Sequence, residues 1–120
     1  MYFNNDYIMR QLENMTRALA NILFDRDIPA VELFDEYGNL TSSGILYHRL
    51  RHLMAEGKIC QAEDLLFEEM RRNPLPAHLG AAVEFYNDLS RLSDAELERG
   101  GFSRKEISEG IEDAMKLYEI

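Results

Sequence analysis

Hydrophobic residues recur every three or four positions along most of the chain, which is the spacing of one face of an α-helix. The pattern is clearest from Asp6 to Phe24, where it comprises Ile8, Leu12, Met15, Leu19, Ile22 and Leu23. The period-two alternation of a strand never persists for more than a few residues. We therefore expect an all-α protein, a bundle of about five to seven helices that forms one domain over residues 1–120.

Glycine, proline and serine divide the first half of this pattern into elements. A short helix is expected within residues 25–39, and Ser42 or Ser43 is expected to cap the helix after it. That helix should turn inward Ile45, Leu46, Leu50, Leu53 and Met54. Gly57 should end it, because glycine adopts positive φ without steric cost. The following helix should bury Ile59, Ala62, Leu65, Leu66 and Met70.

The second half is divided in the same way. A helix is expected at about residues 77–92, with an inward face of Leu79, Ala82, Val83, Tyr86 and Leu89. Ser93 with Glu96, and Ser103 with Glu106, have the Ser-x-x-Glu spacing of a capping box. The pair of glycines at 100 and 101 separates the two boxes, which predicts a short helix followed by a longer terminal one.

Two helices joined by a turn as short as the one at Gly57 must pack antiparallel. Residues 43–76, with Gly57 at the turn, Ala62 as the small residue for close approach, and Pro74 as the closing proline, resemble one tetratricopeptide unit. The match occurs once, whereas arrays of this repeat need three. We therefore expect a bundle that contains one tetratricopeptide-like helix pair. With residues 6–24 near its start and 92–107 near its end, the whole chain also resembles a small uncharacterised bacterial family with such hairpins.

The tetratricopeptide resemblance implies a non-catalytic protein-interaction or adaptor module. In that family the earlier helix of each pair lines a concave surface, which corresponds here to Tyr47, Arg51 and Met54 as the partner-binding residues. The partner would be another protein or peptide. An alternative is a structural role through homo-oligomerisation, in which the apolar stripe from Ile8 to Leu23 binds a second copy.

The composition restricts the partners further. There are 22 acidic against 13 basic residues, a net charge of −9, which argues against nucleic acid and anionic lipid. The segment 91–107 is similar to a motif of short arginine-rich bacterial proteins linked with RNA, so a nucleic-acid-associated regulator stays an alternative. No apolar run approaches the roughly 20 residues of a membrane span, and the first residues do not resemble a secretory signal. We expect a cytoplasmic protein.

Three groups of residues are of types that can carry chemistry. Cys60 is the only cysteine and lacks an adjacent base, so we interpret it as a passive side chain. His48, His52 and Glu56 follow one another at intervals of four, a spacing that suits a metal, but this stripe is expected to face water. The carboxylates Glu63, Asp64, Glu68 and Glu69 are interpreted as a solvated helix face. The sequence thus predicts no catalytic residue, no metal site and no cofactor.

Overall fold

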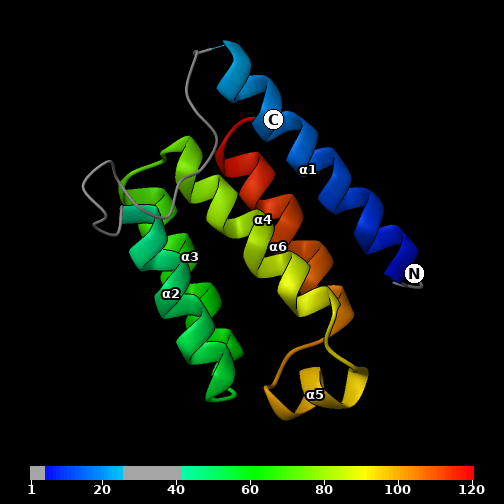
Figure 1. Cartoon of the computed structure of the whole chain (residues 1–120). Helices are drawn as coiled ribbons and strands as arrows, with labels where there is room; N and C mark the ends of the chain where they lie inside the picture. Colours follow the sequence, from blue (N-terminus) through cyan, green and yellow to red (C-terminus); the bar gives the residue numbers. More distant parts are fainter. Residues whose placement is uncertain (1–4, 26–41) are drawn as a thin grey trace.

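The chain folds into six helices over the residues that the computed structural model describes, which are 5–25 and 42–120 (Figure 1). The helices are α1 (Asn5–Asp25), α2 (Ser42–Ala55), α3 (Ile59–Arg72), α4 (Pro76–Ser90), α5 (Asp94–Arg99) and α6 (Arg104–Leu117). No strand occurs in these two ranges. The expected all-α bundle is confirmed, and none of the described helices is long and apolar enough to cross a membrane. The short helix expected within residues 25–39 lies, beyond Asp25, outside the described residues.

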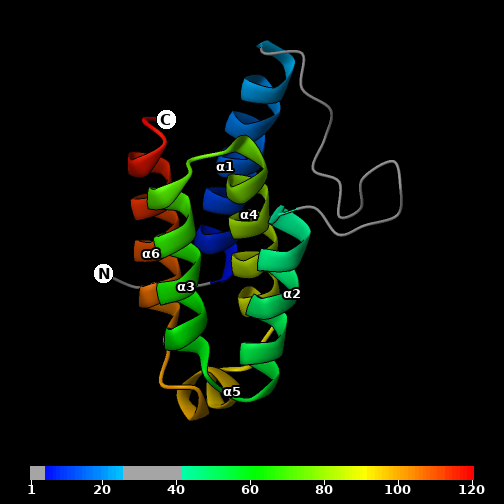
Figure 2. The same ribbon diagram turned by 90° about the vertical axis from the view of Figure 1, so that its left-hand side faces the viewer.

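Helix α4 is the centre of the bundle. It packs against α1, α2, α3 and α6, while α2 also packs on α3 and α1 on α6 (Figures 1 and 2). Its side chains are therefore buried around much of its circumference, including those of Leu79, Ala82, Phe85, Tyr86 and Leu89. Two helix pairs thus flank one apolar helix, and α3 and α6 are held on α4 with little direct contact between them.

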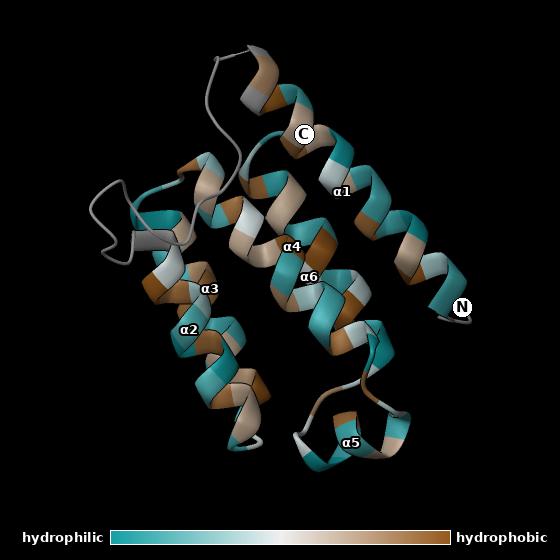
Figure 3. Ribbon diagram, in the orientation of Figure 1, coloured by the Kyte–Doolittle hydropathy of each residue, from teal (hydrophilic) through white to brown (hydrophobic). Residues whose placement is uncertain are grey.

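Helices α1, α3 and α6 are amphipathic, and each has both hydrophilic and hydrophobic residues in Figure 3. Ile8, Leu12, Met15 and Leu19 of α1 are buried as the periodicity predicted. They are covered by the chain's own bundle, in which α1 packs on α4 and α6. Self-association through this stripe stays a prediction, but these four residues are already buried in the core of the chain itself.

The turn between α2 and α3 has the predicted form. Gly57 has φ +76°, and the Gly57 amide donates to the Met54 carbonyl oxygen at 2.9 Å. The two helices pack side by side and antiparallel, as expected for so short a connection. Among the capping predictions, Ser93 and Glu96 form the full reciprocal box, at 3.1 and 3.0 Å. Ser103 makes only the bond from the Glu106 amide, at 3.3 Å.

Some local predictions were wrong. The sequence predicts Ile45 on the inward face of its helix, but Ile45 is 46% exposed. Because α2 contacts the bundle through Leu46 and Leu50, a residue one position away points about 100° off that face. Helix α2 begins at Ser42, so both Ser42 and Ser43 lie inside it rather than at its cap. The pattern also missed Phe67 and Phe85, which are both buried.

Candidate functional site

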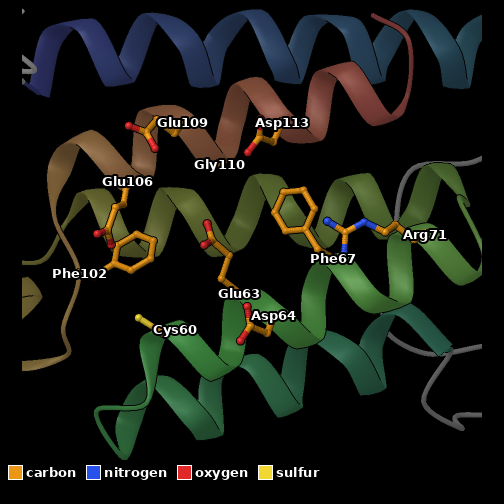
Figure 4. A pocket seen from close by; sticks show the side chains of 10 residues that line it. All are labelled: Cys60, Glu63, Asp64, Phe67, Arg71, Phe102, Glu106, Glu109, Gly110 and Asp113. Atoms are coloured by element: carbon orange, nitrogen blue, oxygen red, sulfur yellow. The ribbon is translucent and has the colours of Figure 1, made fainter.

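A groove of about 590 Å³ runs between α3 and α6. Figure 4 shows α3 on one side, α6 on the other, and α4 behind them. The groove exists because both walls pack on α4 rather than on each other. Its lining consists of Cys60, Glu63, Asp64, Phe67 and Arg71 from α3, Phe102 from the turn before α6, and Glu106, Glu109, Gly110 and Asp113 from α6.

The groove is acidic. Among the described residues, five that line it are carboxylic acids and one, Arg71, is a cation. Glu63, Glu106 and Asp113 point toward the space between the two helices in Figure 4. Glu109 is paired with Lys105 at 3.7 Å, but within the described residues no cation lies within ion-pair distance of the other four carboxylates. The groove therefore presents a negative surface that attracts cations.

Aromatic rings give the groove apolar parts. Phe67 lies in the α3 wall, and the Arg71 guanidinium is 5.4 Å from its ring centroid, a cation–π distance. Phe102 lies at the other end, where the Cys60 thiol contacts the Gly101 carbonyl oxygen at 3.4 Å. Burial, with nearby Glu106, raises the pKa of the Cys60 thiol, whereas a nucleophilic cysteine needs a lowered pKa.

Beneath the groove Tyr86 of α4 donates a hydrogen bond of 2.6 Å to Glu63 Oε2. Tyr86 is 0% exposed, so its hydroxyl needs an acceptor inside the protein, and Glu63 supplies it. Burial is the largest cause of a raised pKa of Glu63, and the Tyr86 bond opposes it in part. Burial and the Glu63 carboxylate raise the pKa of Tyr86 as well. The interpretation of Glu63 as a solvated surface charge was therefore wrong.

Gly110 allows this pair to form. A β-carbon at position 110 would overlap the Tyr86 hydroxyl and would lie 2.5 Å from Glu63 Oε2. The α6 backbone thus lies directly against the Tyr86–Glu63 hydrogen bond. No sequence signal pointed to this arrangement, because its three residues come from three different helices.

The residues predicted to bind a partner lie on α2, outside this groove. The Tyr47 hydroxyl donates to Asp88 Oδ2 of α4 at 2.9 Å, and the exposed Arg51 guanidinium lies 5.8 Å from the Tyr47 ring centroid. Burial, followed by the Asp88 bond, raises the pKa of Tyr47. Met54 is half-buried. Tyr47 thus has a contact within the chain, and a binding role for these three residues stays a prediction.

In the histidine stripe, His52 contacts Glu56 at the surface. His52 Nε2 lies 2.7 Å from Glu56 Oε1, and Lys58 Nζ lies 3.0 Å from Glu56 Oε2. The Lys58 contact is the largest cause of the lowered pKa of Glu56. Over residues 5–25 and 42–120, no three His, Cys, Asp or Glu side chains are placed to hold one metal ion.

These features define an all-α helical bundle with a central helix and an acidic groove between two of the flanking helices. The chain belongs to the DUF6483 family, described as a family of unknown function, whose model matches residues 2–119. This agrees with the uncharacterised family that the sequence resembled. Comparisons with curated proteins and with solved structures give no match.

Proposed function

We propose that the protein is a non-catalytic interaction module that binds a positively charged helical segment of a protein partner in the groove between α3 and α6. The observation that carries the proposal is the groove itself, in which Asp64, Glu106 and Asp113 have no ion-pair partner among the described residues. Charge complementarity across such a surface raises the association rate and selects the partner.

The apolar parts of the groove support a helical ligand. Phe67 and Phe102 lie toward its two ends, with the carboxylates between and around them. An amphipathic helix presents apolar and charged side chains at intervals of three and four residues, so it can meet both kinds of surface at once. The proposal retains the tetratricopeptide-like character of the α2–α3 pair and the cytoplasmic location expected from the sequence.

A second candidate function is that of an enzyme. It is supported by Glu63, because a desolvated carboxyl group in a cleft is a feature of general acids. A structural role also explains why Glu63 is desolvated, because the hydroxyl of the fully buried Tyr86 needs that carboxylate as its acceptor. We therefore favour binding. The substitution Glu63→Gln distinguishes the two roles, because glutamine keeps an oxygen acceptor for Tyr86. An interaction module should retain most of its peptide binding, because Glu63 is half-buried, its Oε2 already accepts the Tyr86 hydrogen bond, and four other carboxylates line the groove.

Calorimetric titration with an amphipathic lysine–leucine helical peptide tests the proposal directly. The control ligand is the same peptide with glutamate in place of lysine, which the groove should not bind. The double variant Glu106→Gln/Asp113→Asn should weaken binding of the lysine peptide about tenfold, since each exposed ion pair contributes up to about 1 kcal/mol. Glu98→Gln on α5, an exposed carboxylate outside the groove, is the matched control and should leave the affinity unchanged.

Cys60 provides a second readout. It lines the groove, is exposed and is the only cysteine, so a bound peptide should slow its alkylation. Equal affinity for both peptides, or equal affinity of the groove variant and wild type, would refute the proposal. If Tyr47→Ala/Arg51→Ala weakens binding while the groove variant does not, the partner binds at the predicted α2 surface instead.

A further inference from the structure

Helix α2 carries the charge opposite to that of the groove. It contains Arg49 and Arg51 and has no Asp or Glu among its residues. Arg49 is exposed and has no hydrogen-bond or ion-pair partner in the part of the chain that the structure describes. This helix therefore carries a positive charge, although the whole chain has a net charge of −9.

The outer face of α2 also has an apolar element. Ile45, 46% exposed, lies on the same side of the helix as Arg49 and His52, because four and three residues separate them in turn. His48 and His52 are exposed beside them, and with Arg49 and Leu53 they line a shallow hollow of about 340 Å³. This face therefore combines an unpaired cation with an exposed apolar side chain, the two features that the groove is suited to bind.

The two surfaces lie on different sides of the molecule. In Figure 2, α3 and α6 lie on the left and α2 on the right, with α4 between them. The outer face of α2 points away from the bundle, since Leu46 and Leu50 on its other face are buried. A chain cannot insert this face into its own groove, but a second copy can present it.

We infer that the positively charged helix bound by the groove is the outer face of α2 from a second copy of this chain. This inference rests on the proposed function and names the partner. In the contact, Arg49 of one copy faces the carboxylates Asp64, Glu106 and Asp113 of the other, and Ile45 lies against one of the two aromatic ends of the groove. The contact joins two different surfaces, so each added copy leaves one α2 face and one groove free, and growth continues to rings or open chains.

Sedimentation velocity on the full chain at increasing concentration tests the inference. The wild type should show species larger than a monomer whose proportion rises with concentration. High salt should dissociate them, because the Debye length falls from about 10 Å at 0.1 M to about 3 Å at 1 M. Arg49→Glu should weaken association at least about tenfold, since it replaces an attraction with a repulsion. Arg10→Glu, an exposed arginine on α1, is the matched control and should associate as the wild type does.

A mixing experiment is specific to contacts between two different surfaces. Arg49→Glu has an altered α2 face and an intact groove, whereas Glu106→Gln/Asp113→Asn has a neutralised groove and an intact α2 face. At a concentration where each variant alone is monomeric, an equimolar mixture should form a 1:1 dimer that does not grow, because the two remaining surfaces, a glutamate at position 49 and a groove that retains acidic residues, do not attract each other. With Glu98→Gln in place of the groove variant, both surfaces of that partner are intact, so the mixture should contain species larger than a dimer.

A monomeric wild type at every concentration, or a mixture that stays monomeric, would overturn the inference. The lysine–leucine peptide separates this failure from failure of the proposed function. If the peptide binds the groove while the chains do not associate, the groove binds a different cationic partner. If neither occurs, both proposals are wrong. Far-UV circular dichroism of each variant should match the wild type, because all the substituted positions are exposed.

Discussion

Replacement of Gly110 by alanine tests the packing that forms the groove floor. The new β-carbon would overlap the Tyr86 hydroxyl and would lie 2.5 Å from Glu63 Oε2 and 2.6 Å from Tyr86 Cζ. Glu63 is half-buried and can swing into the groove, but Tyr86 is 0% exposed and is enclosed by the core. Relief of the overlap therefore requires α6 to move away from α4, and with it the groove wall.

The cost follows from two opposing effects. Overpacking a core costs about 1–3 kcal/mol, and displacement of the Tyr86–Glu63 hydrogen bond adds about 1 kcal/mol. Alanine recovers up to about 1 kcal/mol through its higher helix propensity. We expect Gly110→Ala to lower the free energy of unfolding by about 2 kcal/mol, which is a large fraction of the roughly 6–18 kcal/mol expected for a domain of this size.

Urea denaturation followed by circular dichroism at 222 nm measures this change, and a Tyr86→Leu background provides the control. Leucine removes the ring atoms that overlap the new methyl group, which then fills part of the cavity left behind. Gly110→Ala should therefore be neutral or stabilising in that background. The same loss of stability in both backgrounds would refute the reasoning, because it would place the strain elsewhere in α6.

Three further predictions concern single side chains. The folded pKa of Glu63 is raised above the unfolded 4.5, so its protonated form favours folding and this stability is lost as pH rises through the folded pKa. Glu63→Gln should consequently reduce the loss of stability above pH 4.5, and urea midpoints across that range that parallel the wild type would contradict this. Ser93→Ala should cost about 1 kcal/mol in thermal unfolding through the lost helix cap, and Ser93→Asp should restore most of it. Arg104 donates to the Ser90 and Leu92 carbonyl oxygens at 3.1 and 2.6 Å, so Arg104→Lys, which lacks the planar fork, should cost about 2 kcal/mol by urea denaturation. An unchanged midpoint for Arg104→Lys would mean that α4, α5 and α6 do not depend on this connection.

Local sequence was sufficient where one element decides the outcome by itself. The α1 stripe from Ile8 to Leu19, the positive φ at Gly57 and the Ser93–Glu96 box each depend on residues close together in the sequence, and all three were predicted correctly. Periodicity was insufficient where the orientation of a helix decides burial. Ile45 satisfied the apolar pattern as well as Leu46 did, and only the position of α3 and α4 against α2 leaves it exposed.

The candidate site was not predictable because it depends on distances between helices. Glu63 and Tyr86 are 23 residues apart, and Gly110 lies on a third helix. In the sequence, Glu63 is one of several carboxylates in an acidic run. Nothing in that run indicates which carboxylate accepts a hydrogen bond from a buried hydroxyl. The groove depends on α4 keeping α3 and α6 apart, which the pattern of a single helix does not encode.

The sequence by itself determined the described helices, most of their ends and the antiparallel pair at Gly57, because hydrogen bonding, caps and amphipathic spacing act over one or two turns. The tertiary structure alone decided which charges are solvated, which are desolvated and where an acidic surface forms. The physical reason is that desolvation and electrostatic potential depend on every group nearby in space, whichever helix it comes from.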